Sequence, residues 1–391
     1  MTKPDISTFS VPKKTLNMLQ KNCKYNETII DYYDRLLTSS VSNGKIKLYD
    51  NKIASMKMCN TIWDVEKYKK QEVLDMIRTN LCRDRFCNNC KKVRQAQRMA
   101  KFVPAIKSKK KEMNMSQMVL TVRNVIDDGS GKQLRQMIEI MFRAFASLIE
   151  YLKGKKKIKG LDFKSLVGYK GAIRSLEVTY KKANGVNEYH PHLHILVGHT
   201  QYFGKKKYRN DYSYDKKKRR NTRFFNEVEI LIQKIWRLLV DDITEHLESG
   251  AEGSRARINK KRIDELSLGY SCTIDKFEED DFIELFKYMT KADGKKKDDE
   301  ESSLMTFDNF KTLLFGLKGV RQIQGYGCFF NIKDSDDMGD ETMKEYEELI
   351  AELKQKETPE QSEETLQGIQ KSKYKVISRK KVPASLRPKN K

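Results

Sequence analysis

The chain is 391 residues long, and its 78 lysines and arginines outnumber its 54 aspartates and glutamates, for a formal net charge of +24. No stretch of about 18 apolar residues is present to cross a bilayer, and the N-terminal segment lacks the apolar core of a signal peptide. We therefore expect a cytoplasmic protein with no membrane partner. Lysine-rich runs recur along the chain, and so large a positive charge favours a polyanion such as nucleic acid as the partner.

The elements expected in chain order alternate between short apolar runs and helical patterns. In turn, the sequence predicts a basic helix at 91–105, a strand at 116–122, a helix at 131–153, strands at 172–180 and 189–197, a lysine- and tyrosine-rich loop at 201–220, helices at 224–247 and 280–291, and a strand at 325–332. Asn184-Gly185 is a strong hairpin-turn signal between the two middle strands. This order predicts an α+β fold with an antiparallel sheet and helices on one face.

Composition divides the chain into segments. We expect an N-terminal extension at 1–45, a cysteine-rich and basic helical region at 46–111, the main folded domain at 112–332, and a charged, partly disordered tail at 333–391. Most of the chemistry-bearing residues lie in the middle two segments.

Four of the seven cysteines lie in one region: Cys82, Cys87 and Cys90 are spaced C-x4-C-x2-C, and Cys59 lies upstream. Tetrahedral zinc takes four soft ligands of this kind, and in a reducing compartment clustered cysteines indicate metal rather than disulfides. The alternative is a set of buried free thiols, which behave as small apolar groups. Arginine, aspartate and asparagine flank these cysteines, however, and suit a core poorly. The sequence favours a structural Zn²⁺ site.

Three of the five histidines, His190, His192 and His194, lie within five residues of one apolar run. Because successive side chains of a strand point to opposite faces, all three project from the same side. Two imidazoles on a rigid element suit a divalent metal. A row of polar residues on the wet face of a half-buried strand is the alternative, and we favour the metal.

The hairpin brings Glu177 to the same face. A turn centred between Asn184 and Gly185 pairs Glu177 with His192, and a turn centred one residue later pairs it with His194. Two imidazoles and a carboxylate leave open positions on a hard or borderline divalent ion, which can polarise a phosphate oxygen. Glu177 as an ordinary exposed strand residue remains an equal alternative.

A covalent mechanism needs a nucleophile, and the predicted helix at 280–291 offers one. Glu284 and Tyr288 are four residues apart and share a helix face, with Lys291 three residues further on. Nearby cations and a metal-activated phosphate would assist attack by the phenol. Taken alone, such a pair is usually an ordinary helix surface pair.

Together these motifs resemble a known family. H-P-H-L-H-I-L-V looks like the HUH motif of the HUH endonucleases. Its combination with E-L-F-K-Y-M-T-K and C-x4-C-x2-C is similar to the replication initiator (Rep) proteins of rolling-circle plasmids from Gram-positive bacteria, one-tyrosine type. The strand at 118–122 and the segment 318–327 resemble further family motifs. One departure is Asn88, which follows Cys87 where the family usually has proline.

The resemblance implies an HUH endonuclease, RRM-like fold for 112–332, with His192 and His194 as ligands of Mg²⁺ or Mn²⁺ and Glu177 as the third ligand. It also implies plasmid origin DNA as substrate, as a double-strand origin, hairpin or single strand. Host replication helicase and polymerase, and further copies of the chain on DNA, are the other expected partners.

The resemblance further implies that Tyr288 attacks the phosphodiester at the origin, keeps the 5′ phosphate and frees a 3′ hydroxyl. Glu284 would activate water for the terminating cleavage, because a carboxylate can serve as a general base at neutral pH. Within the same chemistry, a mobilisation relaxase or a one-tyrosine transposase is an alternative. A non-catalytic, zinc-containing nucleic-acid-binding protein is a third, although it leaves the co-occurrence of H-x-H and E-x-x-x-Y unexplained.

Overall fold

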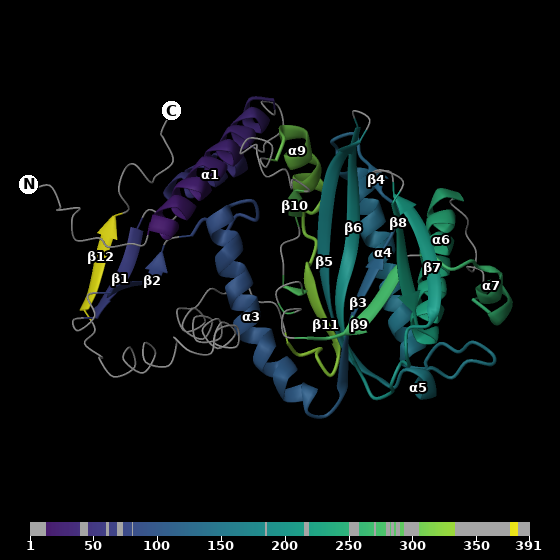
Figure 1. Cartoon of the computed structure of the whole chain (residues 1–391). Helices are drawn as coiled ribbons and strands as arrows, with labels where there is room; N and C mark the ends of the chain where they lie inside the picture. The colour runs from purple at the N-terminus through teal and green to yellow at the C-terminus, as the bar shows by residue number, and fades with distance from the viewer. Residues whose placement is uncertain are drawn as a thin grey trace, which may run out of the picture. The chain divides into compact units, whose positions relative to one another are not determined.

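The computed structural model divides the chain into two compact units, Met1–Lys101 with Ser335–Lys391, and Phe102–Asp334. It describes residues 13–39, 46–59, 62–68, 73–79, 81–183, 186–214, 219–249, 258–269, 271–278, 282, 285–286, 290–292, 305–332 and 376–381 (Figure 1).

The first unit contains helices and a small sheet. Helices α1 (Lys13–Ser39) and α2 (Ile46–Met58) pack together, and strands β1 (Ile62–Tyr68), β2 (Val73–Thr79) and β12 (Val376–Lys381) form an antiparallel sheet in the order β12-β1-β2. Helix α3 (Asn88–Lys110) begins in this unit. Two segments that the sequence set apart, 1–45 and 333–391, therefore each contribute an element to this unit.

The second unit is built on a mostly antiparallel sheet. Its main path runs β10 (Thr290–Ala292), β5 (Tyr169–Ala183), β6 (Val186–His199), β3 (Asn114–Thr121) and β9 (Cys272–Lys276), with β11 (Ile323–Gly327) beside β5 and β4 (Val125–Ile126) beside β6. Among the described strands of this unit, only β10 pairs in parallel, with Thr290 opposite Val178. Strand β5 thus has β11 along its first half and β10 along its second half on the same edge.

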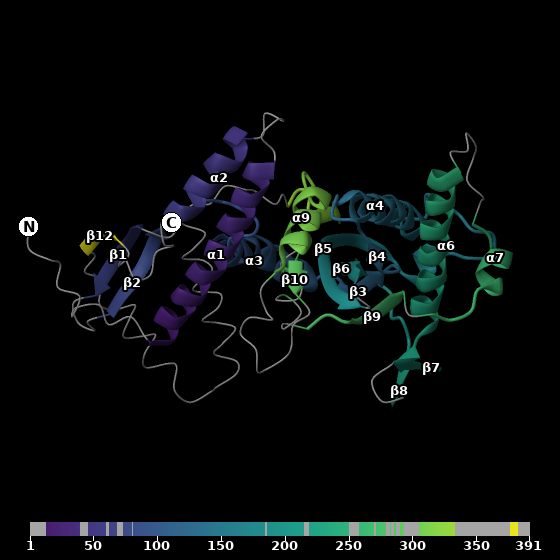
Figure 2. The ribbon, with the colours of Figure 1, turned by 90° about the horizontal axis from the view of Figure 1, so that it is seen from above.

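Helices cover one face of this sheet, as the predicted α+β architecture requires. The long helices α4 (Lys132–Leu152) and α6 (Glu227–Ser249) pack against each other and the sheet, and α9 (Phe307–Gly316) packs against α4 (Figure 2). Phe145 of α4 packs edge-on against Tyr326 of β11, and Trp236 of α6 donates a hydrogen bond to the Thr121 carbonyl at 2.8 Å. Short helices α5 (Phe163–Leu166) and α7 (Lys260–Glu265) lie in the same unit.

The start of α4 is set by a loop carboxylate. Asp127 is buried and accepts hydrogen bonds from the backbone amides of Gly129, Gly131 and Leu134 at 2.9, 2.8 and 3.1 Å. Gly131 has φ 73°, and a Cβ there would collide with the backbone of Gly316 in α9. Only glycine combines the left-handed backbone with this close approach of the two helices.

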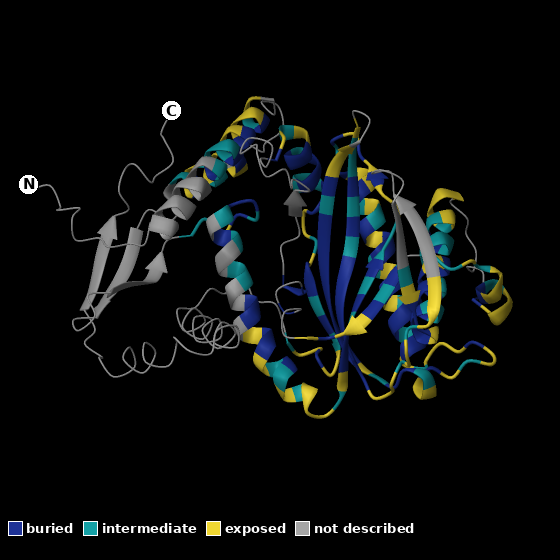
Figure 3. Ribbon diagram, viewed as in Figure 1, coloured by how far each residue is buried: buried dark blue, intermediate teal, exposed yellow. Residues whose placement is uncertain are grey.

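The two faces of the sheet differ in chemistry. Met118, Leu120, Leu176, Leu193 and Ile195 alternate along β3, β5 and β6 and form the core beneath α4 and α6. The intervening residues on the opposite face include the polar side chains that the sequence singles out. Strands β5 and β6 are buried along most of their length on both faces (Figure 3).

Several sequence predictions differ from the structure. The strand predicted at 325–332 ends at Gly327, where the chain enters a turn, and the helix predicted at 224–247 begins only at Glu227. The predicted loop at 201–220 contains most of a hairpin, β7 (Tyr208–Tyr214) paired with β8 (Arg219–Phe225). The tyrosines at 208, 212 and 214 stand at even spacings and favour a strand despite the density of basic charge. The helix predicted at 280–291 is wrong at its C-terminal end, where residues 290–292 form β10. Pairing with β5 gives hydrogen-bond partners to an edge that would otherwise lack them, which outweighs helical propensity.

Candidate metal centres

The hairpin of β5 and β6 places a carboxylate opposite two histidines. Glu177 pairs with His192 and Ser175 pairs with His194, which is the first of the two registers that the sequence allowed. Because paired residues in an antiparallel ladder project from the same face, Glu177, His192 and His194 lie together on the face away from α4 and α6.

The two imidazoles converge on one carboxylate oxygen of Glu177. His192 Nε2 and His194 Nε2 donate to Glu177 Oε2 at 3.0 and 2.9 Å. Glu177 is 5 % exposed and His194 is 9 % exposed, so the cluster is largely sheltered from solvent. Glu177 is therefore not the ordinary exposed strand residue that was its alternative.

The spacing of these atoms fits a divalent ion. Two neighbouring ligands of an octahedral ion, each about 2.1 Å from the metal, lie about 3.0 Å apart, and both nitrogen–oxygen separations match this value. Among the described residues the three form one of two groups able to hold a metal. Imidazole with carboxylate is a donor set that several divalent ions of borderline character accept.

Electrostatics keep Glu177 in the ligand form. Burial raises the pKa of its carboxyl, but the hydrogen bonds and charges of His192 and His194 outweigh burial, so the pKa lies well below the ordinary value. A carboxylate that stays ionised can act as a metal ligand without first losing a proton.

His190 occupies the next position along the same face. Its ring stacks on that of His192 with centroids 5.5 Å apart, and its Nδ1 lies 2.9 Å from Asn124 Oδ1. Asn124 also donates to Glu188 at 2.6 Å. Sequence reasoning missed Asn124, because an asparagine just after a strand has the appearance of a turn residue.

The proposed nucleophile region is described only in part. Tyr288 and Glu284 lie outside the described residues, and Lys291 is placed in β10, opposite Thr179, rather than on a helix. On either side of Tyr288, Phe286 is fully buried and Thr290 pairs with Val178, the residue after Glu177.

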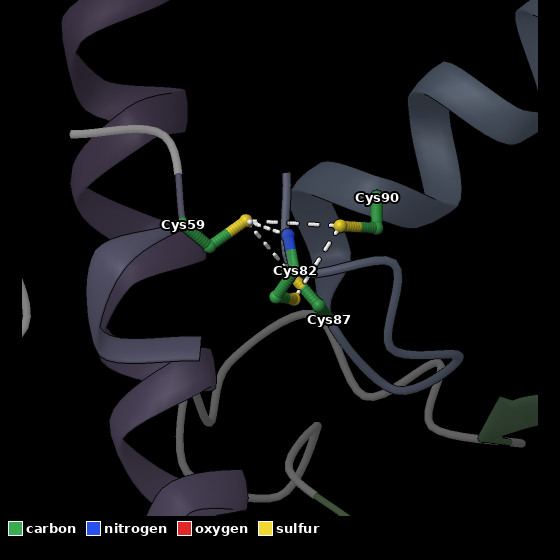
Figure 4. Close-up of side chains that lie close together, drawn as sticks. All are labelled: Cys59, Cys82, Cys87 and Cys90. Atoms are coloured by element: carbon green, nitrogen blue, oxygen red, sulfur yellow. Dashed lines mark hydrogen bonds between the residues drawn. The ribbon is translucent and has the colours of Figure 1, made fainter. Parts of the chain in front are cut away.

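The four cysteines of the first unit form the second cluster (Figure 4). Cys59 Sγ lies 3.6 Å from Cys87 Sγ and 3.7 Å from Cys90 Sγ, and Cys82 Sγ lies 3.5 Å from Cys90 Sγ. In a tetrahedral zinc site with bonds of about 2.3 Å, neighbouring sulfurs lie about 3.8 Å apart. The donor set and its spacing therefore fit zinc.

Hydrogen bonds from the surrounding chain support this cluster. Asn26 Nδ2 of α1 and the Cys82 backbone amide donate to Cys87 Sγ and Cys59 Sγ at 3.2 and 3.5 Å. Hydrogen bonds from the Cys59, Cys82 and Cys90 thiols lower the pKa of Cys87 below its ordinary value. Such donors to sulfur stabilise thiolate, the form that binds metal.

A buried aspartate holds the cysteine loop. Asp84 accepts from the Tyr33 hydroxyl of α1 at 2.9 Å and from the Phe86 amide at 2.8 Å, and it pairs with Lys52 of α2 at 2.6 Å. The departure at Asn88 does not disturb this arrangement, since the Asn88 amide donates to Asn26 Oδ1 at 3.2 Å.

The sequence of this chain is similar to those of known replication proteins. Residues 73–242 match the family model described as replication protein. Similar curated proteins include "Protein rep" from Staphylococcus aureus, 28% identical over 41% of this chain and 63% of its own length, and "Protein rep" from Bacillus sp, 35% identical over 22% and 24%. A third, "Protein rep" from Lentilactobacillus hilgardii, is 29% identical over 32% of this chain and 35% of its own length.

The chain thus matches less than two thirds of the length of these relatives. No solved structure gives a significant match. The region matched by the family model includes Glu177, His192 and His194 and ends before Tyr288. Within the described part of the chain, no helix has the length and apolar character needed to span a membrane.

Proposed function

We propose that this chain, a Rep replication protein over residues 73–242, initiates rolling-circle replication of a plasmid by nicking and rejoining its origin DNA. The observation that carries the proposal is the convergence of His192 and His194 on Glu177 inside the matched region. A purely binding protein has no need of a sheltered set of two imidazoles and a carboxylate, which is a ligand set for a divalent ion.

The chain's residues divide the work of the reaction between them. His192, His194 and Glu177 would hold the ion, which supplies polarisation of the scissile phosphate and orientation of its leaving oxygen. Both histidines and Glu177 lie on paired strands of a rigid sheet, so their positions are set before DNA binds. Such preorganisation lowers the cost of reaching the transition state.

Tyr288 would provide the nucleophile. Its oxygen forms a bond to phosphorus and loses its proton, while the bond from phosphorus to the 3′ oxygen breaks and that oxygen takes up a proton as a free hydroxyl. The 5′ phosphate stays on the tyrosine. The support for this role comes from the position of a nearby residue. Thr290, two residues after Tyr288 in sequence, pairs with Val178, and Val178 directly follows Glu177.

Glu284 and Lys291 would complete the reaction. A carboxylate four residues before the tyrosine suits the activation of water for the terminating cleavage, and a lysine three residues after it adds positive charge. Basic segments would hold origin DNA through its phosphates. Host helicase and polymerase, and further copies of the chain at the origin, would act after the first nick.

Replacement of Tyr288 by phenylalanine tests the nucleophile. We expect Tyr288→Phe to abolish covalent attachment to a labelled single-stranded origin oligonucleotide in Mn²⁺, since the phenyl ring has no oxygen to form the bond, while binding stays within about twofold. Covalent products are counted on a denaturing gel.

The matched control is Tyr202→Phe, which removes the hydroxyl of a tyrosine that is 81% exposed and should retain full attachment. Persistent labelling of Tyr288→Phe would show that another residue is the nucleophile. If the wild-type protein binds the plasmid but never nicks it with added Mg²⁺ or Mn²⁺, the non-catalytic alternative replaces this proposal.

A further inference from the structure

A pocket of about 250 Å³ lies between α4 and the edge of the sheet. Its walls combine apolar and basic side chains from three stretches of the second unit: Arg135, Ile138, Glu139 and Phe142 of α4, Arg174 of β5, and Gly319, Val320, Arg321 and Gln324 around the start of β11. It opens on the helical side of the sheet, so it is separate from the cluster around Glu177.

Arg174 is the unusual member of this lining. It is 1% exposed, yet it forms no ion pair with a carboxylate of the described residues. Nη2 donates to Gln324 Oε1 at 3.2 Å and to the Arg321 carbonyl at 3.5 Å, and the Tyr326 side chain also interacts with the guanidinium group. Nε and Nη1 are buried, and no acceptor among the described residues lies within hydrogen-bond distance and geometry of either nitrogen. These two nitrogens carry three of the five donor hydrogens of the guanidinium group.

A purely structural role does not account for those donors. The guanidinium carbon lies 3.5 Å from the centre of the Phe142 ring. This cation–π contact covers the flat face of the guanidinium group but uses none of its N–H donors. Donors in the plane of the group are left unpaired, although buried charges are ordinarily paired and hydrogen-bonded. The arrangement therefore has capacity for an anion.

The other charges of the lining favour the same ligand. Arg321 is exposed, forms no ion pair within the described residues, and lies close enough to Arg174 to repel it. The single acid, Glu139, is already paired with Arg135 at 2.6 Å. Three arginines against one glutamate leave the pocket with an excess of two positive charges.

We propose that this pocket binds a phosphoryl group, held by the in-plane donors of Arg174 together with Arg321. Planar guanidinium groups bind the oxygens of phosphate in pairs, which a single-point cation cannot do. At about 250 Å³ the pocket is smaller than the roughly 300–1,000 Å³ typical of sites for drug-sized ligands. It therefore suits one phosphate group, with any attached group outside.

This site is distinct from the one that would hold the scissile phosphate. Arg174 and Glu177 lie three positions apart on β5, so their side chains point to opposite faces and their backbones are about 10 Å apart. Two sources of phosphate share the required chemistry: a free phosphate or the end of a small phosphate ester, and a backbone phosphate of the bound DNA.

Titration of the full-length protein with inorganic phosphate tests the proposal. We expect phosphate to raise the thermal unfolding midpoint in a saturable way at constant ionic strength, with chloride as the reference salt. Arg321→Gln should weaken phosphate binding by about tenfold, the usual effect of one lost charge-assisted hydrogen bond, and Arg174→Met should abolish it.

Arg237→Gln is the matched control, because Arg237 is a half-exposed arginine of α6 that pairs with Asp241 outside the pocket. It should bind phosphate as the wild type does. Arg321 is exposed, so its variant keeps the test valid if Arg174→Met fails to fold. Equal stabilisation by phosphate and chloride, or unchanged phosphate affinity in Arg321→Gln, would overturn the proposal.

Competition identifies the source. If a single-stranded DNA oligonucleotide displaces bound phosphate and Arg321→Gln lowers DNA affinity, the pocket takes a backbone phosphate. If both bind together, it takes a free phosphate group. Because Tyr288→Phe and Glu177→Gln should leave this titration unchanged, failure of the nicking proposal and failure of this one are distinguishable.

Discussion

At the scale of single residues, the sheet of the second unit buries charged groups that are the candidates for binding ligands. Glu177 and Arg174 are three residues apart on β5, and both are less than a tenth exposed. Glu177 meets two imidazole donors, so its charge is matched by its surroundings. The guanidinium group of Arg174 stacks on the ring of Phe142 and donates from Nη2 to two oxygens, which leaves the N–H groups of Nε and Nη1 for a ligand.

A change at Glu177 tests the metal centre directly. We expect Glu177→Gln to weaken Mn²⁺ binding by about tenfold or more, because an amide oxygen replaces a charged ligand in a site of similar shape. Calorimetric titration of the purified protein with Mn²⁺ measures this change. Glu188→Gln, on the same hairpin but paired with Lys181 at 3.3 Å, should bind Mn²⁺ normally; equal affinities in both variants would remove Glu177 from the ligand set.

At the scale of elements, regular alternation and helical spacing are reliable where the chain is strongly patterned. The predicted strand at 116–122, helix at 131–153 and hairpin of 172–180 with 189–197 correspond to β3, α4 and the β5–β6 pair. The short strand β10 was missed because its pairing with β5 depends on residues more than a hundred positions away.

The start of α4 provides a prediction at this scale. Asp127→Ala removes the acceptor of three backbone amides, so we expect the free energy of unfolding to fall by about 1–2 kcal/mol, the usual loss for a helix cap. Urea denaturation measures it. Asp128→Ala is the comparison, since the Asp128 side chain is exposed and accepts from the Ser130 amide, which lies before α4. A loss as large in that variant would contradict the capping role.

At the scale of the whole molecule, the described residues contain two candidate metal sites, one in each of the two units. The cysteine cluster lies among α1, α2 and the start of α3, whereas the histidine cluster lies in the large sheet. The two sites draw on different donors, thiolate sulfur against imidazole and carboxylate, and so select different ions. We therefore propose a structural ion for the first unit and a catalytic ion for the second.

Metal content tests that division. We expect about one tightly bound zinc per chain in the purified protein and a loss of most of it in Cys90→Ser, because a hydroxyl is a poor replacement for thiolate. Elemental analysis after dialysis measures it. Cys328→Ser, which changes an exposed cysteine outside the cluster, should keep its zinc. Full zinc content in Cys90→Ser would exclude the four-cysteine site.

The local sequence determined the strands and helices with strong periodicity, the hairpin, and the identity of the residues in both clusters. It could do so because side-chain direction along a strand and the donor chemistry of cysteine, histidine and glutamate are local properties. Between two registers of the hairpin, only the folded chain decided that Glu177 faces His192.

Tertiary structure alone decided which polar groups are buried and what they meet. An arginine between Ile173 and Ser175 has no local signal of burial, and Asn26, far from the cysteines in sequence, donates to Cys87 only once α1 is packed. Burial and long-range hydrogen bonds depend on elements brought together from distant parts of the chain. That is why the phosphate pocket around Arg174 became visible only in the fold.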